Sequence, residues 1–290
     1  MNIPVYIRRR FGLVATVIAC AVSAPVLASE SVHLDKFPTE KMQSMPALQD
    51  GARTFVNYCL NCHSASMMRF NRLQDIGLTD EQISGSLQFT EGRVGDLMKV
   101  HEDGKAWFGA APPDLSVEAR ARASESGSGA DWIYTYLRSY YRDGSRETGW
   151  NNAIFPNVGM PNPLWQWQGM RGAVEERVAP VTDEATGKVT GWTKTTITYD
   201  REGNKSEKVE KVSGDGLHEG THFTLGTPEG GTLSQAEFDD KVANLVAFMK
   251  FMSDPSASTR GRLGIWVLLF IALFVGCTWW LNREYWKDIK

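Results

Sequence analysis

Apolar residues recur at helical spacing in three stretches of the chain, each flanked by polar residues. In chain order, their apolar faces consist of Phe55, Val56 and Cys59; Trp132, Ile133, Tyr136, Leu137 and Tyr140; and Phe238, Val242, Leu245, Val246, Met249 and Met252. Because such a stripe fits one face of an α-helix, we predict helices over 50–62, 128–144 and 234–254. The second would end near Gly144, and the third at Asp254, which precedes a proline.

Two of these helices carry start signals. Ser128 is followed three residues later by Asp131, and Ser234 by Glu237, so each pair can form a capping box. Irregular or polar sequence fills 29–48, 64–125 and 171–220. Within the last of these segments, alternating residues on both sides of a turn predict an exposed β-hairpin over 192–212, without a core of its own. The predicted fold is therefore mostly α, with long loops and a small β-hairpin excursion.

Two apolar runs lie near the ends of the chain. Residues 264–281 carry no charge, and their length approaches the roughly 20 residues that cross a bilayer. The run from Phe11 to Val22 is shorter, follows three arginines and precedes small residues, as in a cleaved signal peptide. Lipidation of Cys20 is an alternative for this end. The predicted organisation is a signal peptide over 1–28, an exported domain over 29–260, a transmembrane anchor over 261–282 and a cytoplasmic tail over 283–290.

A single C-x-x-C-H motif, Cys59-Leu60-Asn61-Cys62-His63, ends the first predicted helix. The pattern is typical of covalent haem c attachment, because each of the two thiols can form a thioether with one haem vinyl group. His63 then lies beside the second thioether and supplies one axial nitrogen to the iron. The motif predicts one haem c, covalently bound through Cys59 and Cys62.

Two other uses of a C-x-x-C pair fit the chain less well. A redox dithiol of the thioredoxin kind needs a βαβ context, whereas the residues before Cys59 predict a helix. A structural zinc site needs a second pair of ligands at suitable spacing. His218 and His222 are four residues apart, but no further thiol accompanies them. We therefore expect these histidines to lie in a loop.

Composition and net charge further limit the classes of protein to which the chain can belong. The hydrophobic content of 42% and charged content of 22% are ordinary for a globular chain. The net charge of −3 disfavours non-specific binding to nucleic acid. Removal of 1–28 makes the charge −6, because this segment holds three arginines and no acidic residue. Cys59 and Cys62 are the only thiols of the exported domain, so covalent haem rather than a disulfide would stiffen it.

The second axial ligand decides whether the haem can bind a small molecule or can only exchange electrons. Met160 is the favoured ligand, because the preceding glycine lets the backbone approach closely and the neighbouring prolines stiffen the loop. Met98 and His101 are the alternatives. A methionine opposite a histidine raises the reduction potential relative to two histidines.

Several short motifs occur in the order found in cytochrome c1 of the cytochrome bc1 complex, and the chain resembles this family over most of its length. The matching residues are Cys59 to His63 followed by Met68-Arg69-Phe70-Asn71-Arg72-Leu73; Pro112-Pro113-Asp114-Leu115-Ser116 with Arg120-Ala121-Arg122; Phe155-Pro156 with Gly159-Met160-Pro161; Leu245-Val246-Ala247-Phe248; and Arg283-Glu284-Tyr285-Trp286-Lys287-Asp288. The resemblance implies a cytochrome c-like haem domain with a C-terminal anchor. Trp132 follows an aspartate at a position where members of this family often carry a tyrosine.

The resemblance also implies a function. The chain would be the electron-transfer subunit of a respiratory quinol–cytochrome c oxidoreductase, with His63 and Met160 as axial ligands and Arg122 as a haem-propionate partner. Its partners would be cytochrome b, a Rieske iron–sulfur protein and a soluble cytochrome c. No substrate chemistry is expected in this chain alone. The alternative is a membrane-anchored c-type cytochrome that serves a terminal oxidase or reductase.

Localisation and docking follow from the same features. The signal peptide and anchor predict a single-pass protein of a bacterial inner membrane, with its haem domain on the periplasmic side. Because soluble cytochrome c is often basic, an acidic surface would speed the encounter. The candidate acids for such a surface are Glu175, Glu176, Asp183 and Glu184.

Overall fold

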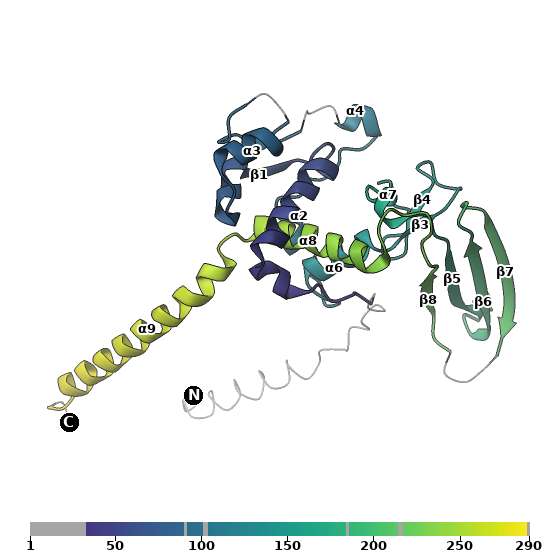
Figure 1. Ribbon diagram of the computed structural model, residues 1–290. Coiled ribbons are helices and arrows are strands. Elements are labelled where there is room, and N and C mark those ends of the chain that lie inside the picture. The colour runs from purple at the N-terminus through teal and green to yellow at the C-terminus, as the bar shows by residue number, and fades with distance from the viewer. Residues whose placement is uncertain (1–32, 90–91, 101–103, 184–185, 214–216, 289–290) are drawn as a thin grey trace, which may run out of the picture. The chain divides into compact units, whose positions relative to one another are not determined.

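The structure, a computed structural model, describes residues 33–89, 92–100, 104–183, 186–213 and 217–288 (Figure 1). Its helices are η1 (Thr39–Gln43), α2 (Met45–Tyr58), η2 (Phe70–Ile76), α3 (Asp80–Ser86), α4 (Gly104–Phe108), α5 (Glu118–Ala121), α6 (Gly129–Leu137), α7 (Trp165–Gln168), α8 (Gln235–Ser253) and α9 (Ala257–Tyr285). Its strands are β1 (Ala65–Arg69), β2 (Leu97–Met98), β3 (Tyr140–Arg142), β4 (Trp150–Asn152), β5 (Ala173–Thr182), β6 (Val189–Tyr199), β7 (Lys205–Val212) and β8 (Gly220–Leu225). The predicted helix-rich fold with one long apolar C-terminal helix is confirmed.

Helices α2 and α8 pack against each other at the centre of the main core (Figure 1). Gly51 on α2 permits their close approach, since a Cβ there would lie 2.0 Å from the backbone oxygen of Asn244. Phe55 and Phe248 meet across this contact, with ring centroids 5.5 Å apart. Helix α6 also packs on α8. Most of the three predicted apolar faces therefore join in one core.

The predicted helix starts are confirmed at α6 and α8. The Ser128 side chain accepts a hydrogen bond from the backbone N–H of Asp131, whose carboxylate accepts one from the backbone N–H of Ser128. Ser234 and Glu237 form the same reciprocal pair at α8. Each pair satisfies two backbone donors that the first turn of a helix leaves unbonded.

Three predicted helix boundaries are wrong. Helix α2 ends at Tyr58 rather than Cys62, with Cys59 as its C-cap and Cys62 in the turn that follows. Helix α2 begins at Met45 rather than Asp50, because the Ser44 side chain accepts from the backbone N–H of Ala47 and a proline occupies the first turn. Helix α6 ends at Leu137 rather than near Gly144, since the next residues form β3 and pair with β4. The polar segment 29–48 likewise contains η1 within its described part, and 64–125 holds short elements only.

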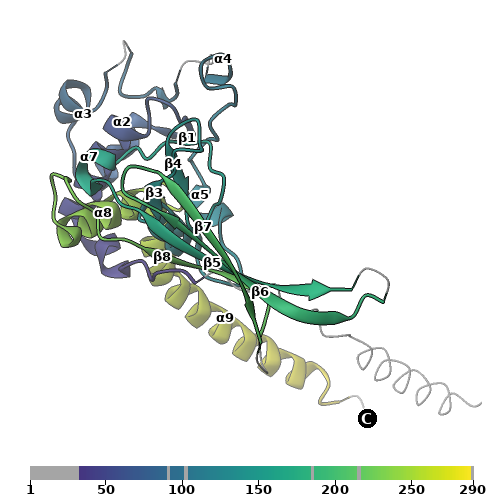
Figure 2. The same ribbon diagram turned by 90° about the vertical axis from the view of Figure 1, so that its right-hand side faces the viewer.

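The predicted hairpin is confirmed as β6 and β7, but it belongs to a four-stranded antiparallel sheet in the order β7-β6-β5-β8 (Figure 2). Strand β5 pairs with β6 on one side and with β8 on the other. The expectation that this region lacks a core is wrong. Tyr141, Ala173, Ile197 and Tyr199 form a small buried cluster, against which Phe223 and Leu225 pack.

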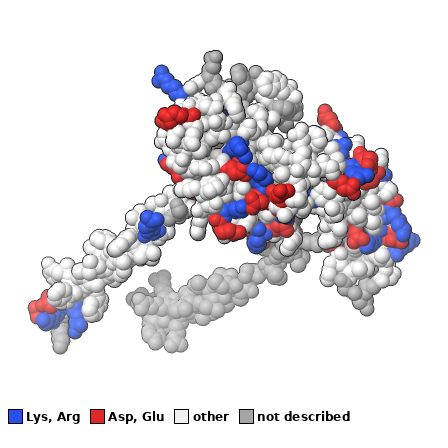
Figure 3. Space-filling view, viewed as in Figure 1, with Lys and Arg blue, Asp and Glu red and all other residues white. Residues whose placement is uncertain are grey.

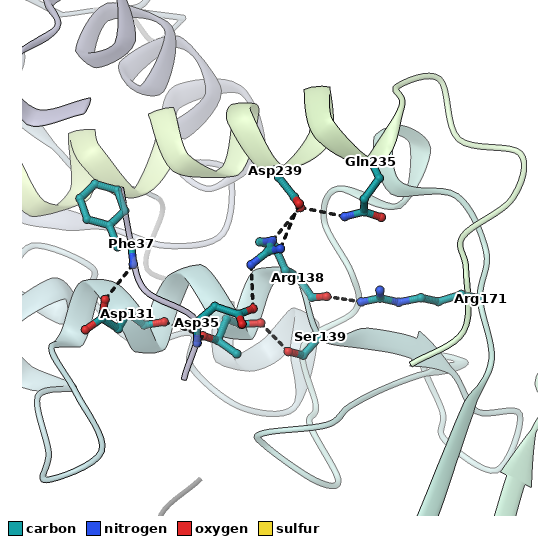
Figure 4. Close-up of polar contacts among 9 residues, drawn as sticks. Asp35, Phe37, Asp131, Arg138, Ser139, Arg171, Gln235 and Asp239 are labelled. Atoms are coloured by element: carbon teal, nitrogen blue, oxygen red, sulfur yellow. Dashed lines mark hydrogen bonds and ion pairs between the residues drawn. The ribbon is translucent and has the colours of Figure 1, made fainter. Parts of the chain in front are cut away.

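A polar network around Arg138 ties α6 to α8 and to the segment before η1 (Figure 4). The Arg138 guanidinium donates to both carboxylate oxygens of Asp239 at 2.6 and 3.0 Å, and to Asp35 at 2.7 Å. Buried Arg171 donates to the backbone oxygens of Arg138 and Tyr140. Burial, reinforced by the nearby Arg138 charge, lowers the pKa of Arg171 to about 10.

Helix α9 has the length and composition of a membrane span. Residues Thr259–Tyr285 have a mean hydropathy of 2.1 over their most apolar window, and none of that window is buried within the described chain. Figure 3 shows α9 without charge along most of its length, with charged side chains near both ends. The predicted signal peptide over 1–28, including Cys20, lies outside the described residues.

Candidate haem site

The two thiols of the C-x-x-C-H motif lie just after the C-terminal end of α2, whereas the prediction placed them within the helix. Cys59 is the C-cap residue and is buried, and Cys62 is half-buried in the following turn. The backbone N–H groups of Cys62 and His63 both donate to the Cys59 oxygen, which brings the three residues together. Both cysteines are free. Burial, together with repulsion from Cys62, raises the pKa of Cys59 to about 12, so its thiol is neutral at physiological pH.

His63 is held in one orientation by a distant segment. Its Nδ1 lies 2.8 Å from the backbone oxygen of Pro113. Because a carbonyl oxygen only accepts, Nδ1 carries the proton and Nε2 keeps its lone pair. His63 is only 8% exposed, which limits the freedom of the ring. The ring is therefore oriented so that Nε2 can supply its electron pair to a metal.

The segment that carries Pro113 is bonded to the residues just after the motif. The backbone N–H of Leu115 donates to the Ser64 oxygen, and that of Ser66 donates to the Asp114 carboxylate, both at 2.8 Å. Burial raises the pKa of Asp114, but hydrogen bonds from Ser116 and Ser66 outweigh it and hold the pKa below its usual value. Residues Pro112, Pro113 and Asp114 form a strap beside the motif. This Pro-Pro-Asp strap fixes the carbonyl that orients His63.

Met160 lies in a second cluster, next to the aromatic face of α6, which Trp132 and Tyr136 form. It is half-buried and packs with Tyr140, Trp150 and Val158. The Tyr136 hydroxyl lies 3.7 Å from the Met160 sulfur. Tyr136 also packs against the main core, which contains Cys59. Through Tyr136, Met160 therefore adjoins the main core, to which Cys59 also belongs.

Arg122 sits at the other end of the same aromatic face. Its Nε donates to Glu118 at 2.8 Å, and its guanidinium lies 4.6 Å from the centre of the Trp132 ring. Trp132 in turn stacks on Tyr136, with ring centroids 4.9 Å apart and an interplanar angle of 12°. Trp132 therefore serves as a stacking platform between the guanidinium and Tyr136.

Named relatives match over nearly the whole chain. The ammonia monooxygenase gamma subunit of Nitrosomonas europaea is 38% identical over 92% of this chain and 94% of its own length. Cytochrome c1 of Allochromatium vinosum is 33% identical over 96% of this chain and 98% of its own length. The chain belongs to the cytochrome c1 family. Cytochrome c1 of Rhodospirillum rubrum is 23% identical over 96% of this chain, and no family model matches the chain.

Membership of the cytochrome c1 family implies a haem c, the partners of a bc1 complex and attachment to a membrane. The described residues fit that cofactor on chemical grounds. The free thiols of Cys59 and Cys62 lie at the two ends of one turn, and the neighbouring His63 keeps Nε2 for a metal. The side chain of Met160, itself a thioether, contacts Tyr136 on α6. Nitrogen and thioether donors of this kind suit haem iron.

The alternative ligands of the sequence analysis occupy different places. Met98 is fully buried in β2, where it pairs with Ala65 and belongs to the main core. His101 lies outside the described residues. His222 is on β8, opposite Glu176, so the expectation of a loop is wrong for it. His218 does lie in a loop before β8. Within the described ranges, no group of three or more His, Cys, Asp and Glu could hold a metal.

Of the four candidate acids for docking, Glu175 is the one that the structure contradicts. Glu175 is buried and paired with Arg177, and Glu176 pairs with Lys194. Asp183 is exposed and accepts hydrogen bonds from Thr186, and Glu184 lies outside the described residues. Alternation along β5 placed Glu175 on the face that packs inward, which its charge alone did not reveal.

Proposed function

We propose that this protein is the electron-transfer subunit of a quinol–cytochrome c oxidoreductase, with one haem c. The observation that carries the proposal is the His63 geometry. At the end of α2, the histidine of a C-x-x-C-H motif is tied through Nδ1 to the Pro113 oxygen, in a chain of the cytochrome c1 family. That hydrogen bond leaves Nε2 as the metal-binding atom.

Each site residue has a defined role in this proposal. Cys59 and Cys62 would hold the haem by thioethers, and His63 and Met160 would supply the nitrogen and sulfur donors to its iron. Arg122, braced by Glu118 and Trp132, faces a haem propionate. When bound, the haem supplies a one-electron couple between ferrous and ferric iron. The protein orients the ligands, excludes water through its buried core and sets the potential through the sulfur donor.

The proposed topology combines the two ends of the chain. A signal peptide over 1–28 exports the haem domain, 29–260, to the periplasm of a bacterial cell. The anchor over 261–282 lies within α9, and residues 283–290 face the cytoplasm. The haem domain then receives single electrons from a Rieske iron–sulfur protein beside cytochrome b and passes them to a soluble cytochrome c.

Replacement of Met160 tests the axial assignment. Met160→Leu keeps the bulk of the side chain but removes its sulfur, while the thioethers of Cys59 and Cys62 keep the haem attached. We expect the variant to bind carbon monoxide, the wild type not to bind it, and the variant to have a lower reduction potential. Visible spectra with carbon monoxide and a redox titration measure both effects.

Met170→Leu is the matched control, because Met170 packs in the same cluster as Met160. We expect it to keep the wild-type spectrum and potential. An unchanged spectrum and potential in Met160→Leu would remove Met160 from the site and direct attention to Met98 and His101.

The 38% identity to a protein named ammonia monooxygenase gamma subunit supports a second candidate function. In it, the same anchored haem domain delivers electrons to another membrane complex, such as an oxidase or reductase. Purification in mild detergent separates the two candidates. Co-purification of cytochrome b and a Rieske protein supports the first, and their absence beside a different membrane enzyme supports the second.

A further inference from the structure

Two tyrosines contact Met160 at two different atoms. We propose that Tyr136 and Tyr140 are positioning residues that share one hydrogen bond to Met160 and so hold it towards the haem iron; the bond runs from Tyr136 to the sulfur or from Tyr140 to the backbone carbonyl. The inference rests on the proposed function, in which Met160 is an axial ligand. It assigns to Tyr136 on α6 and Tyr140 on β3 a role in tuning that ligand, beyond their role as core.

Three short contacts define this arrangement. The Tyr136 hydroxyl lies 3.7 Å from the Met160 sulfur, and the Tyr140 hydroxyl lies 3.3 Å from the Met160 backbone oxygen. The two hydroxyl oxygens lie 2.7 Å apart. Tyr140 is fully buried, and Tyr136 is packed between the main core and the Met160 cluster. Both rings are therefore held by their surroundings rather than free to turn to solvent.

The β3–β4 pair brings the Met160 loop to these tyrosines. Tyr140 on β3 is directly opposite Asn152 on β4, so the chain after Asn152 returns towards α6. The Asn152 side chain donates to the backbone oxygen of Tyr136 at 2.8 Å and accepts from the backbone N–H of Ile154 at 3.1 Å. Asn152 thus anchors the start of the loop to the helix that carries Tyr136.

The three contacts share only two hydroxyl protons, because each tyrosine donates one hydrogen. One proton must lie between the two hydroxyl oxygens, since neither oxygen could otherwise approach the other so closely. One proton is then left for Met160. Either Tyr140 donates to Tyr136 and Tyr136 donates to the sulfur, or Tyr136 donates to Tyr140 and Tyr140 donates to the carbonyl oxygen.

The two arrangements affect the iron in different ways. A hydrogen bond to the sulfur withdraws electron density from the axial ligand, which favours ferrous iron and raises the potential. A hydrogen bond to the carbonyl holds the loop but leaves the electrons of the sulfur unchanged. Loss of the Tyr136 hydroxyl removes the arrangement that reaches the sulfur and should therefore lower the potential. Loss of the Tyr140 hydroxyl frees Tyr136 to donate to the sulfur and should not lower it.

The test uses the full-length, haem-loaded protein in detergent, with Tyr136→Phe, Tyr140→Phe and the double variant. Each substitution keeps the ring and removes only the hydroxyl. We expect the potential to fall in Tyr136→Phe and to stay level or rise in Tyr140→Phe. Imidazole, a competing ligand, should bind about two- to tenfold more tightly to the double variant, as expected for loss of one net hydrogen bond to Met160.

Tyr134→Phe is the matched control, because Tyr134 is on the same helix but packs against Phe37 and Arg138. We expect wild-type potential and imidazole affinity for it. A purely structural role for the tyrosines would shift both single variants in the same direction, and that result overturns the proposal. Wild-type potentials in both also overturn it. If Tyr140→Phe does not accumulate as folded protein, a wild-type potential in Tyr136→Phe is enough by itself to overturn the proposal.

Met160→Leu separates this inference from the proposed function. If it opens the iron to carbon monoxide while the tyrosine variants behave like wild type, only the positioning role fails. If it leaves the iron closed and the potential unchanged, the axial assignment fails and the positioning role fails with it.

Discussion

At the scale of single residues, the site depends on hydrogen bonds that orient each donor atom. His63 gains its orientation from one carbonyl, and that carbonyl belongs to a strap held by Asp114. The Asp114 carboxylate accepts from the backbone N–H groups of both Ser66 and Ser116. Such bonds stabilise the ionised form of the carboxylate, so the strap is coupled to pH.

We predict that Asp114 makes the stability of the protein depend on pH. Its pKa is lower in the folded chain than in the unfolded chain, where the ordinary value is 3.8. The stabilisation is therefore fully present above about pH 4 and is lost as the pH falls through the folded value. Asp114→Asn should be less stable at neutral pH and less sensitive to acid. Urea unfolding followed from about pH 6 to about pH 3 measures this. Glu207→Gln, at an exposed strand position, should keep the wild-type pH profile.

At the scale of elements, the position of α6 is decided by its contact with α8. The pairing of Arg138 with Asp239 crosses between these helices, and both side chains are mostly shielded from water, at 19% and 25% exposure. Burial lowers the pKa of Arg138, but the bonds and charge of Asp239 outweigh it and raise the pKa above its usual value. Because α6 carries the aromatic face that contacts Met160, this ion pair also supports the site.

We predict that Asp239→Ala destabilises the fold by about 1–3 kcal/mol, since it leaves the shielded Arg138 charge with only one carboxylate partner. The neighbouring Asp240 provides the matched control. Asp240 is 55% exposed in its bridge to Lys41, so Asp240→Ala should cost less than about 1 kcal/mol. Chemical unfolding of the two haem-loaded variants compares them. Equal losses of stability would contradict the proposed contribution of the α6–α8 ion pair.

At the scale of the whole molecule, the proposed anchor in α9 and the proposed signal peptide would decide where the haem domain works. The apolar surface of α9 is exposed along its length in the described chain, and a lipid bilayer would cover it. Arginines precede and follow the apolar stretch, so their distribution only mildly favours one orientation. A cleaved signal peptide would therefore decide the orientation.

We predict that protease added to spheroplasts digests the haem domain and spares the C-terminal tail. Loss of the tail with an intact haem domain would contradict this topology. A chain that ends at Ser256, before α9, should be released from the membrane, whereas the full chain should stay with it after an alkaline wash. Retention of the shortened chain would show that a partner or another segment holds the domain.

The sequence alone determined the features that depend on residues close together in the chain. The capping boxes of α6 and α8 join residues three apart, and the C-x-x-C-H motif lies within one turn. The apolar period of each helix and the uncharged run of α9 are also local. Each of these features follows from backbone geometry or from the transfer of apolar side chains out of water. Both effects act within a short segment and do not depend on the rest of the chain.

Only the tertiary structure decided the features that join distant segments. Pro113 reaches His63 across 50 residues, and Met160 reaches Tyr136 because β3 and β4 pair in one register. The same pairing ended α6 early, and strand neighbours turned Glu175 inward. Such contacts depend on which surfaces meet when the core closes, and many arrangements satisfy the same local pattern. Their choice is a property of the whole packed chain, where burial and satisfied hydrogen bonds must be achieved together.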